Sequence, residues 1–251
     1  SLVSSNFNVA IGHNAATAFS SNNGYSVFVG GYAGQSTTTG DYNTVVGSAA
    51  FNDNTTGSNN TVLGTSALGD NTTASNNTAI GFEALRLNTT GTTNTAVGAL
   101  ALDANTTANN NVALGYAAAT SNTTGGQNTA IGADSFGLNT TGGSNTAVGY
   151  GALYSNTTAS SNTAVGRDAL LANTTGASNV AVGALALDAN TTASANTAIG
   201  VSTLTANTTG GSNTAVGTHA LDANTTASNN TAVGRNSLLA NTTGASVTAV
   251  G

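Results

Sequence analysis

The sequence predicts an all-β fold, a single parallel β-solenoid (β-roll) of about 14 coils. A pentapeptide of the form Asn-Thr-Ala-Val-Gly recurs, and from Gly30 to Gly251 its final glycine returns every 17 residues. An aliphatic residue precedes that glycine in every copy, and an Asn-Thr-Thr string follows it at a constant distance over most of the chain. Self-similarity at one short period indicates a repeat architecture and outweighs local propensity.

The residues before the glycine predict a short strand. Thr or Val stands three residues before it, and Val, Ile or Leu stands one residue before it. β-branched residues favour strands, and two positions that lie two apart in a strand point to the same face. We assign this face and the leucine four residues after the glycine to the core. The predicted core residues are Val97, Val148, Val165, Leu102, Leu153 and Leu170.

The rest of each repeat is too short for a helix. Asn, Thr and Gly favour turns because Asn and Gly tolerate left-handed backbone. A strand-helix-strand unit needs roughly 30 residues, whereas one solenoid coil fits into a 17-residue period. Stacked coils place equivalent residues about 4.8 Å apart and bury together an apolar face that no coil buries alone.

Composition excludes several functions. The chain has no Cys and no Pro, only 5% charged residues and a net charge of −6. This balance argues against nucleic-acid binding, and no apolar run is long enough for a transmembrane helix. The two histidines, His13 and His219, lie about a dozen coils apart. We therefore expect no enzyme activity, no cofactor and no metal site.

The acidic side chains fall on the turns. Arg86 is expected between Asp70 and Asp103 of the adjoining coils, in a surface column of charges. A cation shared by Asp53 and Asp70 is the alternative use of this column.

The chain divides into an irregular start and a regular remainder. Residues 1–51 are rich in aromatic residues, lack the Asn-Thr-Thr string and contain the single 18-residue step. We expect them to form irregular N-terminal coils that act as a cap or a subunit junction, or present an aromatic binding patch. Residues 52–251 form the regular 17-residue-repeat solenoid. Its last coil is expected to be followed by further sequence or covered by a neighbouring subunit, and the chain to be mature or part of a longer protein.

The asparagine of each Asn-Thr-Thr string has two possible roles. Stacked Asn side chains can hydrogen-bond along the axis as a ladder, and the same string fits the N-glycosylation acceptor pattern. The ladder is the favoured interpretation. The twelve residues are Asn54, Asn71, Asn88, Asn105, Asn122, Asn139, Asn156, Asn173, Asn190, Asn207, Asn224 and Asn241.

A column of alanine predicts a contact between subunits. The residue two before the glycine should face away from the core pair, yet it is apolar in every regular copy. Exposure of a long apolar stripe to solvent is unfavourable, so we expect this column to pack against sister chains. Alternatively, the interior holds this column and the Val/Thr face makes the contact; both versions require a homo-oligomer. The column comprises Ala79, Ala96, Ala113, Ala130, Ala147, Ala164, Ala181, Ala198, Ala215 and Ala232.

The repeat resembles known surface fibres. Asn-Thr-Ala-Val-Gly followed by a small residue and Leu, over about residues 43–251, is similar to the head repeat of trimeric autotransporter adhesins, the YadA-like head. The longer Asn-Thr-Thr-Gly form resembles repeats of bacterial surface-fibre and tail-fibre-like proteins. This resemblance implies a left-handed roll and three chains around a threefold axis. A weaker likeness connects the repeat to grass ice-binding proteins.

Together these observations predict a bacterial structural protein at the cell surface or outside the cell. We expect a subunit of an extracellular fibre or filament that serves adhesion or attachment to a host or matrix surface. Its main partner would be itself, as a homotrimer or a head-to-tail polymer. The alternative is an ice-binding solenoid that uses threonine arrays. One such column contains Thr95, Thr129 and Thr146, and another contains Thr106, Thr107, Thr140 and Thr141.

Overall fold

The computed structural model describes residues 8–20 and 24–251, and these residues form fifteen three-residue strands and no helix. The strands recur with the period of the sequence. They are β1 (Val9–Ile11), β2 (Val27–Val29), β3 (Thr44–Val46), β4 (Thr61–Leu63), β5 (Thr78–Ile80), β6 (Thr95–Val97), β7 (Val112–Leu114), β8 (Thr129–Ile131), β9 (Thr146–Val148), β10 (Thr163–Val165), β11 (Val180–Val182), β12 (Thr197–Ile199), β13 (Thr214–Val216), β14 (Thr231–Val233) and β15 (Thr248–Val250).

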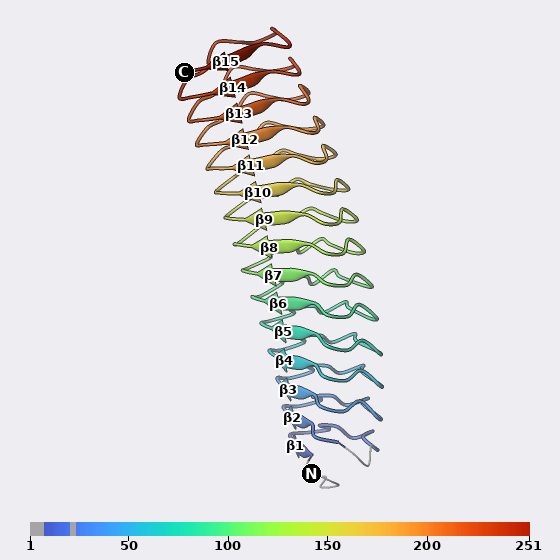
Figure 1. Cartoon of the computed structure of the whole chain (residues 1–251). Helices are drawn as coiled ribbons and strands as arrows, with labels where there is room; N and C mark the ends of the chain where they lie inside the picture. The colour runs from blue at the N-terminus through green and yellow to red at the C-terminus, as the bar shows by residue number, and fades with distance from the viewer. Residues whose placement is uncertain (1–7, 21–23) are drawn as a thin grey trace. The chain divides into compact units, whose positions relative to one another are not determined.

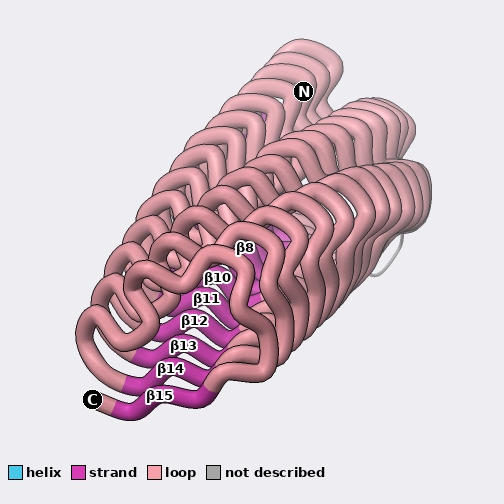
Figure 2. Tube along the Cα trace, turned by 90° about the horizontal axis from the view of Figure 1, so that it is seen from above, coloured by secondary structure: helices cyan, strands magenta, loops and turns pink. Residues whose placement is uncertain are grey.

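The chain forms two compact units, Ser1–Gly126 with β1 to β7 and Gln127–Gly251 with β8 to β15. Within each unit every strand pairs in parallel with the strand of the next coil, as the stacked arrows of Figure 1 show. The pairing joins equivalent residues of successive repeats, for example Ala79 with Ala96 and Ala147 with Ala164. The prediction of an all-β parallel solenoid with 17-residue coils is therefore confirmed. Figure 2 shows that the strands form one side of each coil and turns form the remainder.

The orientation of the strands corrects the sequence analysis. In β6 the middle residue Ala96 is fully buried, whereas Thr95 and Val97 are half-buried. The same pattern holds for β9 and β10, so the core prediction for Val97, Val148 and Val165 is wrong. These valines lie on the outer face of the strand. The prediction for Leu102, Leu153 and Leu170 is confirmed, since each of these side chains is fully buried.

The alanine column belongs to the interior of each coil. All ten alanines predicted to contact sister chains have no exposed surface within the single chain, namely Ala79, Ala96, Ala113, Ala130, Ala147, Ala164, Ala181, Ala198, Ala215 and Ala232. That interface prediction is wrong. A coil of 17 residues encloses a narrow interior, and most coils fill it with one leucine and one alanine, although Phe28, Val45 and Val62 occupy the alanine position in early coils. The first and third residues of the strand point outward.

Left-handed backbone bends the coil sharply at fixed positions. Leu85 and Leu102, four residues after the corner glycine, have φ angles of 53° and 51°. Residues other than Gly and Asn rarely adopt this backbone conformation, which costs them of order 1 kcal/mol. It turns each leucine into the interior, where the side chain is completely buried. Burial of a leucine side chain contributes about 2 kcal/mol, which offsets that local strain.

The corner glycine is required by close stacking of the backbone. Gly81 has a φ angle of 138°, and a Cβ atom placed on it would lie 2.5 Å from the carbonyl oxygen of Gly98 in the next coil. Gly149 repeats the arrangement, with 2.6 Å to the carbonyl oxygen of Gly166. No side chain fits at this position without displacement of the neighbouring coil.

The N-terminal coils follow the same plan where the structure describes them. β1, β2 and β3 pair in parallel like the later strands, although the step between Val9 and Val27 is one residue longer. The exposed rings of Tyr25 and Tyr42 occupy equivalent positions of adjacent coils and stack with centroids 5.4 Å apart. Of the predicted irregular segment 1–51, residues 1–7 and 21–23 lie outside the described residues. Its role as a cap or junction stays a prediction.

Candidate functional site

The asparagines of the Asn-Thr-Thr turns form a buried ladder in each unit. Asn71 Nδ2 donates to Asn54 Oδ1 at 2.8 Å, and Asn156 Nδ2 donates to Asn139 Oδ1 at 2.9 Å. The same Nδ2 atom also donates to a backbone carbonyl three residues later in its own coil, for example from Asn71 to Ala74 at 3.2 Å. Each amide thus closes its own turn and joins it to the next coil. The expected ladder is present, and all but the last of the twelve side chains are fully buried.

The ladder bears directly on the alternative of N-glycosylation. A glycan would be attached at Nδ2, the atom that donates the ladder hydrogen bonds. In the folded solenoid this atom lies in the interior, so modification would have to precede folding and would break the ladder. The buried geometry favours the structural role.

A second asparagine ladder escaped the sequence analysis. It uses the asparagine four residues before the corner glycine, from Asn43 to Asn230, whose side chain is also buried. Asn60 N donates to Asn43 Oδ1 at 2.9 Å, and Asn77 Nδ2 donates to the carbonyl oxygen of Gly91 at 2.9 Å. The constant Asn that opens the repeated pentapeptide was the clue in the sequence.

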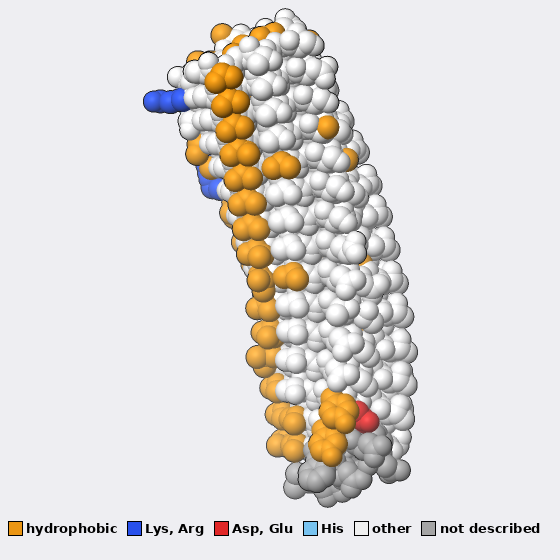
Figure 3. All heavy atoms as spheres, in the orientation of Figure 1, with side chains coloured by type: hydrophobic (Ala, Val, Ile, Leu, Met, Phe, Trp, Pro, Cys, Tyr) orange, Lys and Arg blue, Asp and Glu red, His pale blue; other side chains and the backbone are white. Residues whose placement is uncertain are grey.

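The outer strand face carries two parallel columns of side chains. Thr, or in a few coils Val, stands at the first strand position and Val, Ile or Leu at the third. Figure 3 shows the aliphatic side chains as an orange column beside a mostly white column on this face. Several members are well exposed, including Leu63 at 48% and Ile199 at 41%. An aliphatic surface of this regularity is the most prominent feature of the exterior.

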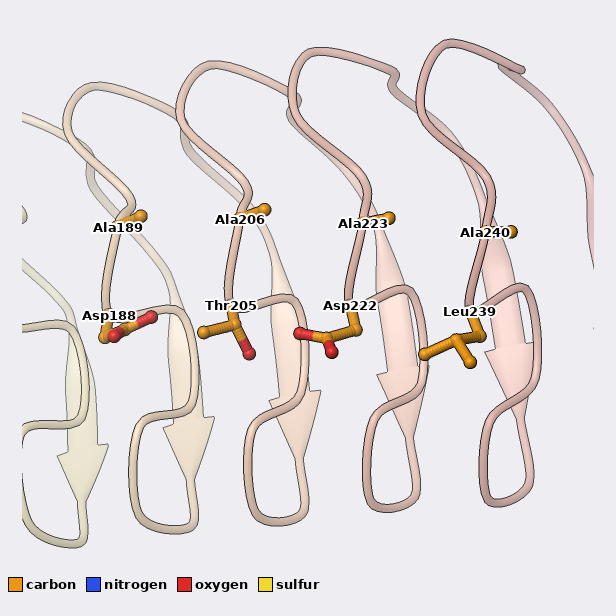
Figure 4. Close-up of a pocket in the computed structure, with 8 residues that line it drawn as sticks. All are labelled: Asp188, Ala189, Thr205, Ala206, Asp222, Ala223, Leu239 and Ala240. Carbon is orange, nitrogen blue, oxygen red and sulfur yellow. The ribbon is translucent and has the colours of Figure 1, made fainter.

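The variable residues of the repeat gather on a different surface. The positions two, five and six residues after the corner glycine line a series of cavities along the turns. One cavity of the second unit has a volume of about 620 Å³. Figure 4 shows its two rows of side chains, each row taken from successive coils. One row contains Asp188, Thr205, Asp222 and Leu239, and the other contains Ala189, Ala206, Ala223 and Ala240.

Two carboxyl groups of this cavity have different surroundings. Burial raises the pKa of Asp188, and neighbouring Asp168 and Asp222 add a smaller effect in the same direction. Its Oδ1 atom and the hydroxyl of Thr205 are buried without a hydrogen-bond partner among the described residues. Asp222 lies 3.3 Å from Nδ1 of His219 in its own coil. The site is a shallow acidic hollow with an alanine floor.

Two smaller cavities lie on the same kind of surface. One of about 370 Å³ in the second unit is lined by tyrosines and aspartates. Another of about 150 Å³ in the first unit includes Asp53, Asp70 and Arg86. Arg86 lies on the coil between those of Asp70 and Asp103, as expected, since Asp70 N donates to Arg86 O at 2.9 Å and Leu87 N donates to Asp103 O at 3.0 Å. The ion pair of its side chain is with Glu83 of its own coil, at 3.8 Å. Positions two and five of one coil face each other across the turn, which brings this pair together.

No group of three His, Asp or Glu residues that could hold a metal ion occurs in the part of the chain that the structure describes. The same residues contain no helix with the length and hydropathy needed to cross a membrane. Comparisons with models of protein families, with curated proteins and with solved structures give no match. The fold defines a β-solenoid repeat protein with two distinct surfaces, the outer strand face and the cavities along the turns.

Proposed function

We propose that this protein is a structural subunit of an extracellular fibre or filament, and that copies of the chain associate through the outer strand face. The observation that supports this proposal most directly is the column of Val, Ile and Leu on that face. Each coil adds one aliphatic side chain to the column, and most are only half-buried by their own chain. Covering such a column removes apolar surface from water, at about 25 cal/mol per Å².

A second copy of the same chain is the most suitable partner for this face. The column repeats with the rise of the coils, so two identical columns match each other along their whole shared length. The face carries no charged side chain, because its positions are occupied by Thr, Val, Ile and Leu. Association therefore does not require burial of an unpaired charge. The resemblance to adhesin heads favours a homotrimer, and a head-to-tail polymer is the other arrangement.

The proposed use is attachment to a host or matrix surface from the bacterial cell surface. The resemblance to surface-fibre repeats supports this location. The internal ladders support it as well, since they join the coils in a chain that has no cysteine and hence no disulfides. A fold of this kind suits an exposed scaffold. The variable residues two, five and six positions after the corner glycine give each coil a different surface chemistry.

Charge placed on the outer strand face tests the assembly. Light scattering should give the mass of an oligomer for the unchanged chain. Replacement of Val148, Val165 and Val182 together by Arg should give a folded monomer, because these side chains point outward. The matched control replaces Thr158, Thr175 and Thr192, which are exposed on a turn, by Arg and should keep the oligomer. A monomeric unchanged chain at high concentration would refute self-association through this face.

Ice binding is a second candidate, and one observation favours it. The threonines of the strands, including Thr95, Thr129 and Thr146, lie on the outer face in a regular column beside the aliphatic one. The structure thus places on the surface a column that the repeat pattern predicts in the core. The turn column is less suitable, since the hydroxyls of Thr106 and Thr140 donate to backbone carbonyls of the next coil. Thermal hysteresis and ice-recrystallisation assays decide the matter, and no effect at millimolar protein would exclude ice binding.

A further inference from the structure

One cavity of the second unit combines aromatic and acidic side chains. Its volume is about 370 Å³, within the range of small-molecule sites. It differs from the larger cavity of Figure 4, whose floor consists of alanine side chains. Its lining consists of two tyrosines, two aspartates, a glycine and a leucine: Asp134, Tyr150, Gly151, Tyr154, Asp168 and Leu171.

The two aspartates of the cavity lie two coils apart, one on either side of the coil that contains Gly151. Asp134, Gly151 and Asp168 occupy the same position in three successive coils, two residues after the corner glycine. The two aspartate Cα atoms are therefore about 10 Å apart, twice the rise of one coil. Gly151, between them, contributes no side chain of its own. A Cβ atom there would lie 2.5 Å from Asp168 Oδ1, so this carboxylate extends over the glycine.

A tyrosine ring forms the opposite wall. Tyr154 lies five residues after its corner glycine, and its neighbour at that position in the preceding coil is Gly137. A Cβ atom on Gly137 would lie 2.6 Å from Tyr154 Cε2 and 3.5 Å from the carbonyl oxygen of Asp134. The ring thus lies over Gly137, on the side of Asp134. The second ring, Tyr150, is 58% exposed at the rim.

The charges of the cavity are unbalanced. Asp168 is paired with Arg167, whose Nη1 lies 3.3 Å from Oδ2, and the side chain of Asp168 is only 15% exposed. Among the described residues Asp134 has no ion pair. One negative charge is therefore left without an opposite charge beside two aromatic rings. The lining offers acceptors, the carboxylates and phenol oxygens, and few donors.

We propose that this cavity binds an organic ammonium group, a quaternary ammonium or a protonated amine. A cation within about 6 Å of a tyrosine ring centroid is attracted by its π face, and carboxylates add Coulomb attraction. A single metal ion fits poorly, because its oxygen ligands lie within about 2.6 Å of it while these carboxylates come from positions two coils apart. An anionic ligand would face Asp134 without a compensating charge. This site is independent of the proposed assembly, which uses the outer strand face.

The test compares a cation with its neutral isostere on the full chain. Choline and 3,3-dimethylbutan-1-ol have the same shape and differ in the positive charge. Titrations followed by NMR should show shifts of the Tyr150 and Tyr154 ring signals with choline, and at least tenfold weaker binding of the alcohol. Nα-acetyl-lysine methylamide serves as the protonated-amine probe, and the tighter of the two cations identifies the source of the ammonium group. Binding of choline should weaken with added salt.

Substitutions assign the binding to this cavity. Asp134→Asn and Tyr154→Leu should each weaken choline binding at least threefold, whereas Tyr154→Phe keeps the ring and should retain most of it. The matched control is Asp222→Asn, which removes a carboxyl from the other cavity of the same unit, three coils beyond Asp168, and should have no effect. Circular dichroism checks that each variant is folded. Equal binding of choline and the alcohol, absence of binding by both cations, or unchanged binding in Asp134→Asn and Tyr154→Leu would overturn the proposal.

Discussion

The side-chain amide of Asn156 donates a 2.9 Å hydrogen bond to Oδ1 of Asn139, one coil away, and both side chains are fully buried. Asn156 in turn accepts from Asn173 at 3.0 Å and donates to the carbonyl oxygen of Ala159 at 3.0 Å. One side chain therefore links three coils and closes its own turn. Such a buried network is costly to interrupt because loss of one side chain removes three hydrogen bonds from the interior.

Loss of one ladder member should destabilise the fold measurably. Asn156→Ala removes three buried hydrogen bonds, those to Asn139 Oδ1, from Asn173 Nδ2 and to the carbonyl oxygen of Ala159. We expect the free energy of unfolding to fall by about 2–4 kcal/mol. Denaturant titration followed by circular dichroism measures this change. The control is Thr158→Ala at an exposed position of the same turn, and equal effects of the two changes would contradict a structural ladder.

Because alanine and not valine points into the interior, a charge should be tolerated at the valine position and not at the alanine position of the strand. Ala96→Asp should lower the free energy of unfolding by about 3 kcal/mol or more, since a carboxylate would be buried without a partner. Val97→Asp should cost no more than about 1 kcal/mol, because the side chain points outward. Melting temperatures at high dilution, where association is minimal, compare the two variants. A larger loss in Val97→Asp would show that the valine is the interior residue.

The corner glycine should not tolerate a side chain. Gly81→Ala places a Cβ atom 2.5 Å from the carbonyl oxygen of Gly98, at a φ angle of 138°. We expect a loss of roughly 3 kcal/mol or failure to fold, because backbone atoms have to move. Gly31→Ala provides the control, since the nearest atom to its added Cβ is 4.0 Å away. Similar melting temperatures for both variants would disprove the steric role of the corner.

The raised pKa of Asp188 predicts a small pH dependence. Burial raises it above the ordinary value of 3.8, so the folded chain binds this proton more tightly than the unfolded chain. Stability contributed by the protonated carboxyl is present below pH 3.8 and is lost as pH rises through the raised pKa. Asp188→Asn should flatten this part of the stability curve by less than about 1 kcal/mol, because the carboxyl is partly solvated. Thermal melts between pH 3 and 7 measure the slope, and an unchanged slope in Asp188→Asn would refute the assignment.

Native protein should resist trypsin. The chain has three possible cleavage sites, at Arg86, Arg167 and Arg235. Although Arg167 is exposed, the backbone beside it is paired, with Gly166 N donating to Val148 O at 2.8 Å and Asp168 N to Tyr150 O at 2.9 Å. Cleavage requires local opening of these coils, which should slow it strongly relative to the unfolded chain. Digestion at equal rates with and without denaturant would contradict packed coils.

The sequence by itself determined the period, the parallel stacking of coils and the position of the turns. These follow from the fixed phase of Gly, Leu and Asn-Thr-Thr, since a constant spacing aligns each residue with its equivalent in the next coil. The asparagine ladder was predictable for the same reason. The resemblance to adhesin heads added expectations about assembly, which concern surfaces between chains.

Only the tertiary structure decided which side of the strand is inside. Ala96 and its neighbour Val97 are both apolar, so alternation over three residues allowed either of them to be buried. The interior of the coil holds Leu102 and the small side chain of Ala96, whereas Val97 points outward. The same closure buries Asn94 and brings Asp134, Tyr154 and Asp168 to one cavity. Those contacts depend on how the turns fold back, which the spacing of residues does not specify.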